Sequence, residues 1–75
     1  MKNKYYKNSL KYLTITEYYC YDGSIVREIN INNKGTYGYV QHNLSPEQLG
    51  LDDIMLIDQS EWEEVLTKFK NHIPA

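Results

Sequence analysis

Two short glycine turns, at Asp22-Gly23 and Lys34-Gly35, constrain the fold more than any other feature of the chain. They divide residues 12–41 into three runs of β-branched and aromatic side chains, which favour β-strands. Turns this short join neighbouring antiparallel strands. The sequence therefore predicts a three-stranded antiparallel meander.

The register of the first hairpin decides which side chains share a face of the sheet. A two-residue turn would place Glu17 opposite Glu28, and like charges that face each other destabilise a sheet. A three-residue loop of residues 21–23, with Gly23 in the left-handed position of a bulge, pairs Glu17 with Arg27 instead. We therefore predict the three-residue loop.

The second turn follows the same logic, with residues 33–35 as its loop. Its pairs are Ile31 with Tyr37, Ile29 with Tyr39 and Arg27 with Gln41. The two registers together predict an apolar inner face that comprises Leu13, Ile15, Tyr19, Ile25, Ile29, Ile31, Tyr37 and Tyr39. They predict an outer face, solvated or binding a partner, that comprises Tyr12, Thr14, Thr16, Tyr18, Cys20, Val26, Glu28, Asn30 and Val40.

The C-terminal sequence SEWEEVLTKFK predicts an α-helix, with Ser60 and Glu63 at the spacing of a capping box. An apolar stripe at helical spacing comprises Trp62, Val65, Leu66, Phe69 and Ile73. We expect this helix to cover the Ile/Tyr face of the sheet. Upstream, SPEQLG predicts one helical turn, and residues 53–57 are a candidate fourth strand. The predicted fold is α+β: a three- to four-stranded antiparallel meander with one C-terminal helix packed on one face.

Residues 1–11 carry four lysines and no acid, and we interpret them as a basic N-terminal arm or an edge strand built on Tyr5 and Tyr6. Residues 12–75 then form a single small domain. A chain of this length buries only roughly 60–65% of its unfolded surface, so its core is thin and a deep cleft is excluded. A domain of this kind favours binding over catalysis.

The sequence contains no pattern that indicates catalysis, a cofactor or a metal site. The GTYG segment has the form of an RNA-binding loop, but the turn already explains Gly35. His42 and His72 lack ligands at the spacing of a zinc site, and the aspartates lack the spacing of a calcium loop. Cys20, with only a distant histidine, is predicted to be a surface thiol. We predict that the protein is not an enzyme and needs no cofactor.

Charge is distributed unevenly although the net charge is only −2. Residues 47–64 contain no Lys or Arg, and their acids are Glu47, Asp52, Asp53, Asp58, Glu61, Glu63 and Glu64. Such asymmetry bears on partners rather than on fold. The single cysteine, and the lack of an apolar run of about 18–20 residues, predict a cytoplasmic protein without a membrane span.

The segments YDGSIVREININNKGTYGYV and LDDIMLIDQSEWEEVLTKF resemble a group of small bacterial domains of unknown function. In that group an Arg-x-Ile-x-Ile strand and a glycine turn precede a short acidic linker and a terminal helix. Such domains are similar to immunity proteins, the inhibitors of bacterial toxins. The resemblance covers residues 17–69, and this chain departs from it in its Lys/Tyr arm and in the position of Trp62. No site residue is carried over from the group.

Our first hypothesis for function is a small acidic inhibitor, of the immunity or phage anti-defence type, that occludes a basic surface of a partner protein, either a toxin or a nucleic-acid-binding enzyme such as a nuclease. The predicted contact residues are Glu47, Asp52, Asp53, Asp58, Glu61 and Glu64, with Tyr12 and Tyr18 on the outer face. An alternative is nucleic-acid association through the Lys/Tyr arm, which the acidic remainder of the domain disfavours. Another alternative is a self-associating structural protein, such as a homodimer formed through an exposed edge strand or through the outer Tyr face.

Overall fold

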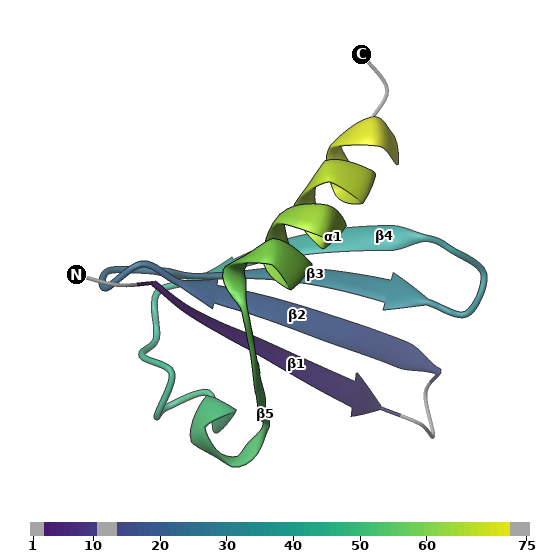
Figure 1. Cartoon of the computed structure of the whole chain (residues 1–75). Helices are drawn as coiled ribbons and strands as arrows, with labels where there is room; N and C mark the ends of the chain where they lie inside the picture. The colour runs from purple at the N-terminus through teal and green to yellow at the C-terminus, as the bar shows by residue number, and fades with distance from the viewer. Residues whose placement is uncertain (1–2, 11–13, 73–75) are drawn as a thin grey trace.

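The computed structural model describes residues 3–10 and 14–72 and contains one five-stranded antiparallel sheet with a single α-helix on one face (Figure 1). The strand order is β4-β3-β2-β1-β5. The strands are β1 (Lys4–Leu10), β2 (Ile15–Tyr21), β3 (Val26–Asn32), β4 (Tyr37–His42) and β5 (Met55–Ile57). A short 3-10 turn, η1 (Leu51–Asp53), precedes β5, and the helix α1 is Gln59–His72. The predicted α+β fold is confirmed, with one strand more than the four expected at most.

The first strand, β1, occupies an inner position between β2 and β5. Its tyrosines point to opposite faces: Tyr6 is 3% exposed, and the ring of Tyr5 lies 6.4 Å from the ring of Trp62 on the helix side. Residues 4–10 are therefore a paired strand rather than an arm, and β5 covers the outer side of residues 5–7 of this strand. The edge beyond β1 is β5, which confirms the candidate strand within residues 53–57.

The first hairpin differs from its predicted register. Gly23 and Ser24 form the tip of the turn, and the Asp22 carboxylate accepts hydrogen bonds from the N–H groups of Ser24 and Ile25 at 2.8 and 3.0 Å. Tyr21 consequently pairs with Val26, and every pair beyond it shifts accordingly. The predicted three-residue loop is wrong because the Asp22 side chain stabilises a four-residue loop, residues 22–25.

The shift changes the partners of the charged residues that had decided the prediction. Glu17 lies opposite Asn30, and Glu28 lies opposite Tyr19, so the two carboxylates are again not directly opposed. Arg27 pairs with Cys20 and Gln41 rather than with Glu17. Separating like charges was a correct criterion, but more than one register satisfies it.

The second hairpin has the predicted register. Asn32 donates its N–H to Thr36 O at 3.1 Å, and Gly35 adopts φ = 79°, the left-handed conformation that the three-residue loop requires. The Asn32 side chain accepts hydrogen bonds from the N–H groups of Lys34 and Thr36. Gly38 lies opposite Asn30, whose side chain fills the space of a Cβ atom. The GTYG segment is thus explained by the sheet alone.

The helix α1 covers the face that carries Ile29 and Ile31, as predicted. Its cap is Asp58, whose carboxylate accepts the N–H of Glu61 at 2.9 Å, rather than the predicted Ser60. The buried residues of this face are Cys20, Ile29, Trp62 and Val65. Partly buried residues around them are Tyr5, Tyr18, Ile31, Tyr37, Ile57, Leu66 and Phe69. The stripe from Trp62 to Phe69 is confirmed, and Ile73 lies outside the described residues.

The register shift exchanges the two faces of β2. Thr16, Tyr18 and Cys20, expected on the outer face, lie on the helix face, whereas Tyr19, expected on the inner face, lies on the opposite one. Cys20 is only 6% exposed, beneath Trp62, so the predicted surface thiol is wrong. Burial raises the pKa of the Cys20 thiol, which makes it a structural residue rather than a reactive one. Tyr18 lies on the same face, between the sheet and the helix.

The opposite face is covered by the segment between β4 and β5 at one end. Leu51 of η1 packs with Tyr6, Tyr19 and Val26, and Val26 is fully buried. The SPEQLG segment forms the expected turn: Ser45 Oγ accepts the Gln48 N–H, and Gln48 Oε1 accepts the Ser45 N–H. Val26 is therefore part of a second core and not of an exposed face.

A polar network occupies the rest of that opposite face. Glu28 is 7% exposed, and its carboxylate lies 2.8 Å from His42 Nε2 and 3.0 Å from Asn30 Nδ2. Burial and a hydrogen bond with Glu17 raise the pKa of the neighbouring Tyr19. Within the described chain no buried side-chain nitrogen or oxygen lacks a hydrogen-bond partner, so this network is satisfied.

Candidate protein-binding surface

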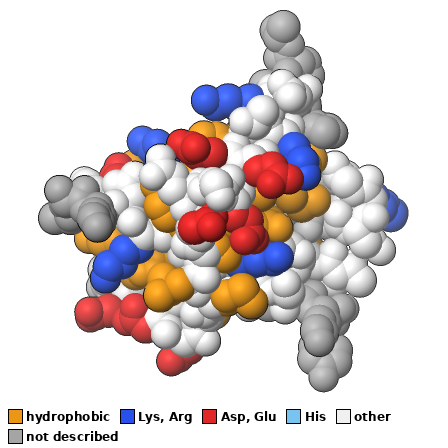
Figure 2. All heavy atoms as spheres, viewed as in Figure 1, with side chains coloured by type: hydrophobic (Ala, Val, Ile, Leu, Met, Phe, Trp, Pro, Cys, Tyr) orange, Lys and Arg blue, Asp and Glu red, His pale blue; other side chains and the backbone are white. Residues whose placement is uncertain are grey.

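The acidic segment wraps around β5 and divides into two groups. The first group surrounds η1 and consists of Glu47, Asp52 and Asp53, which are all exposed. The second lies at the start of α1 and consists of Asp58, Glu61 and Glu64. Figure 2 shows acidic side chains over α1, with hydrophobic side chains gathered below them. The sequence analysis treated these acids as one segment, and the candidate strand within it, now β5, separates them into the two groups.

The second acidic group lines a groove of about 430 Å³ between α1 and β2. Its lining residues are Tyr18, Asp58, Ser60, Glu61, Glu64, Val65 and Lys68. The structure therefore brings Tyr18 together with three of the predicted acids, although the sequence had assigned Tyr18 to the other face. Tyr12 lies outside the described residues, so its predicted role is untested.

Lysines partly balance the carboxylates of this groove. Lys7 Nζ lies 3.6 Å from Glu61 Oε2 and 5.6 Å from the centre of the Tyr18 ring. Lys68 Nζ lies 3.1 Å from Glu64 Oε1. Backbone hydrogen bonding from Glu61, followed by the Ser60 hydroxyl, lowers the pKa of Asp58 and keeps it ionised. Three carboxylates, Asp58, Glu61 and Glu64, face two lysines here, so the groove keeps a net negative charge beside the Tyr18 ring, which Lys7 already contacts.

The strand β5 carries two exposed apolar residues that the sequence analysis did not single out. Met55 is 62% exposed and Leu56 is 67% exposed, the highest values among the exposed large hydrophobic residues of the described chain. The sequence feature that could have identified them is the continuous apolar run IMLI between Asp53 and Asp58. A short continuous apolar run is typical of a strand covered on both faces, yet here it forms an edge.

A second hollow, of about 300 Å³, lies beside Leu56 on the face opposite to α1. Its lining residues are Lys4, Tyr6, Leu51, Asp52, Ile54 and Leu56. Glu47 and Asp52 also line an adjoining hollow of about 210 Å³, together with Lys4. Of the first acidic group, Asp52 therefore borders a largely apolar depression.

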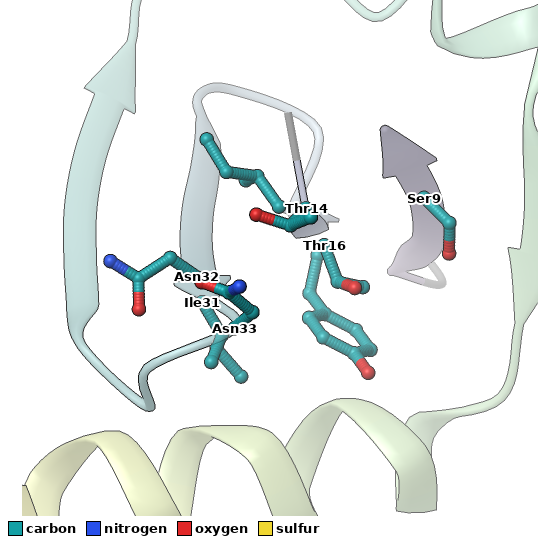
Figure 3. A pocket seen from close by; sticks show the side chains of 8 residues that line it. Ser9, Thr14, Thr16, Ile31, Asn32 and Asn33 are labelled. Atoms are coloured by element: carbon teal, nitrogen blue, oxygen red, sulfur yellow. The ribbon is translucent and has the colours of Figure 1, made fainter. Parts of the chain in front are cut away.

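A hollow of about 470 Å³ at the far end of the sheet has a different character (Figure 3). It is lined by Ser9, Thr14, Ile15, Thr16, Tyr18, Ile31, Asn32 and Asn33. Its polar groups are hydroxyls and side-chain amides, which neither hold a metal ion tightly nor act as a general base near neutral pH. Among the described residues no group of three or more histidine, cysteine or acidic side chains is arranged to bind a metal ion.

Comparison with known proteins gives no relative to this chain: no family model, curated protein or solved structure matches it. In the described part of the chain, no helix has the length and apolar character needed to span a membrane. Function is therefore inferred from the surface around β5 and α1.

Proposed function

We propose that the protein binds a basic partner protein through the surface formed by the two acidic groups and β5, and that it inhibits this partner by occlusion. The observation that carries the proposal is the convergence of Tyr18 with Asp58, Glu61 and Glu64 in one groove. The neighbouring strand β5 exposes Met55 on the side of this groove and Leu56 on the opposite face. Complementary charge speeds the association of two proteins, and desolvated aromatic and apolar contacts hold the complex.

The partner chemistry follows from this surface. Carboxylates flank exposed apolar side chains, so the partner offers lysine or arginine around an apolar centre. Nucleic-acid-binding enzymes, including nuclease toxins, have such basic surfaces because they contact phosphates. An immunity protein and a phage-encoded inhibitor of host defence share this recognition chemistry, and both fit the proposal.

The charge environment of β1 supports the inhibitor over direct nucleic-acid binding. Lys7 is paired with Glu61, and Lys4 lines the hollows that Asp52 borders. These lysines lie beside carboxylates that repel phosphate. Binding of RNA or DNA by the isolated protein, with a steep loss of affinity as salt rises, would contradict the proposal.

The test is affinity capture from the native source at low salt and at about 0.5 M salt, where exposed charges are screened beyond a few ångströms. We expect one basic protein that is weakened by salt and released by the variant Glu64→Lys. The matched control is Glu63→Lys, because Glu63 carries the same charge on the same helix but does not line the groove. Equal capture by both variants would overturn the proposal.

Inhibition is tested separately from binding. The captured protein, once purified, is assayed for its own activity with and without the wild-type chain. Loss of activity at stoichiometric addition supports occlusion. If the chain binds the captured protein tightly but leaves the activity of that protein unchanged, the chain is a binding protein and the proposed inhibition is refuted.

A further inference from the structure

The strand β5 has one hydrogen-bonded neighbour in the described structure, and its other side faces outward. It pairs with β1 through Lys7–Met55, Tyr6–Leu56 and Tyr5–Ile57, and it is the last strand in the sheet order. Successive side chains of a strand point to opposite faces of the sheet. Met55 and Leu56 therefore expose apolar surface on both faces at once, which a solvated edge strand normally avoids.

The surroundings of β5 differ between the two faces. On the face of Leu56, the hollow of about 300 Å³ is walled mainly by Tyr6, Leu51 and Ile54. On the face of Met55, Lys7 lies opposite and is paired with Glu61, so a carboxylate stands on this side of the strand. One face thus offers an apolar depression bordered by Asp52 and Lys4. The other offers the Lys7–Glu61 ion pair at the α1 groove, where the three carboxylates Asp58, Glu61 and Glu64 outnumber the paired lysines Lys7 and Lys68.

We propose that β5 accepts an extended segment of the partner as an added strand, with alternating side chains of two kinds. Apolar side chains enter the hollow beside Leu56, and Lys or Arg side chains point toward Glu61 and the groove of α1. In strand addition, main-chain hydrogen bonds supply affinity and alternate side chains supply specificity. This inference rests on the proposed function, because it gives the mode by which the basic partner is held.

A second copy of the chain is a poor occupant of the same edge. Antiparallel pairing of two β5 strands would bring Asp53 and Asp58 of both copies to the two ends of a three-residue ladder. Like charges close together in a sheet are destabilising. A segment with basic residues around an apolar pair has the complementary pattern, and charge complementarity selects it.

The test uses the full chain labelled with ¹⁵N and a synthetic peptide of about seven residues that alternates valine and lysine, long enough to span β5 and both flanks. A second peptide has the same side chains but N-methylated backbone amides on alternate residues. We expect the first peptide to shift the amide resonances of residues 53–58 and to bind at least roughly tenfold more tightly than the methylated peptide. Equal binding of the two peptides would overturn strand addition.

Absence of shifts in β5 up to about 1 mM peptide, or shifts confined to the other edge strand β4, would also overturn it. A matched pair of variants separates this outcome from failure of the proposed function. Leu56→Lys alters the β5 edge, whereas Val40→Lys alters an exposed apolar residue of β4. If Glu64→Lys releases the captured partner but Leu56→Lys does not, the acidic surface binds and β5 is not the docking strand. If neither releases it, the proposed function itself fails.

Discussion

The two faces of this sheet are closed in different ways. One face lies under α1, whose Trp62 and Val65 bury Ile29 and Cys20 in a single apolar cluster. The other is covered only in part, by Leu51 and its neighbouring turns, and the remainder holds the Glu28–His42–Asn30 network. A rigid helix makes a dry cover, whereas an irregular segment with its own turns covers less and leaves polar groups that must satisfy one another.

Of the substitutions that test this difference between the two faces, removal of the Trp62 side chain is expected to lower the free energy of unfolding most. Trp62→Ala leaves a cavity that α1 cannot fill without tilting, so unfolding free energy should fall by about 3–5 kcal/mol. That loss is comparable with the whole stability of a domain of this size. Urea denaturation followed by circular dichroism measures the change.

Labelling of Cys20 by a thiol reagent, slow in the wild type because the thiol is buried with a raised pKa, should become fast in the variant. Slow labelling of both proteins would mean that α1 is not the cover.

Truncation of Leu51 is the matching change on the opposite face. Leu51→Ala should destabilise by about 2 kcal/mol, at the low end for a buried leucine, because the surrounding turns can relax into the space. The same denaturation experiment compares it with Trp62→Ala. If Leu51→Ala lowers the free energy of unfolding as much as Trp62→Ala does, the segment that covers this face is as rigid as the helix.

The polar network should be sensitive to loss of one partner. His42→Ala leaves the buried Glu28 carboxylate with Asn30 alone and should cost about 1–3 kcal/mol. Adding Glu28→Gln to that variant removes the uncompensated charge and should recover part of the loss. Thermal unfolding of the wild type and the two variants measures both steps. No recovery in the double variant would indicate that water already solvates the carboxylate.

The smallest expected effect concerns the cap of α1 and its dependence on pH. Hydrogen bonding lowers the pKa of Asp58 in the folded state below its unfolded value. Its contribution to stability is therefore present above about pH 4 and is lost as pH falls through the lower, folded value. Asp58→Asn keeps a capping side chain but should flatten the acid limb of the stability curve. An unchanged acid limb in this variant would contradict the role assigned to Asp58.

Sequence reasoning worked where one local interaction decided the structure. Gly35 with its left-handed φ, flanked by Asn32, permitted essentially one loop, and the register of β3 and β4 followed from it. The stripe from Trp62 to Phe69 identified the helix and the face it buries. Both signals lie within a few residues of the structure that they specify.

Other features failed because distant or competing interactions decided them. At Asp22 several turns are compatible with the sequence, and the side-chain hydrogen bonds that select one were not apparent from residue types. Residues 1–11 were left open between an arm and an edge strand because each face of β1 carries one tyrosine beside lysine, so the segment shows no apolar alternation. The contact of Tyr18 with the acidic groove depends on both the register of β2 and the path of α1.

The position of β1 between β2 and β5 also bears on how the chain folds. The hairpins from β1 to β4 close between neighbours in sequence, but the β1–β5 ladder joins segments near opposite ends of the described chain. Such long-range pairing carries a large loop-closure entropy and forms late. During synthesis, the side of β1 that pairs with β5 therefore stays unpaired until β5 has left the ribosome. In that interval its backbone N–H and C=O groups can form hydrogen bonds with a strand of another chain.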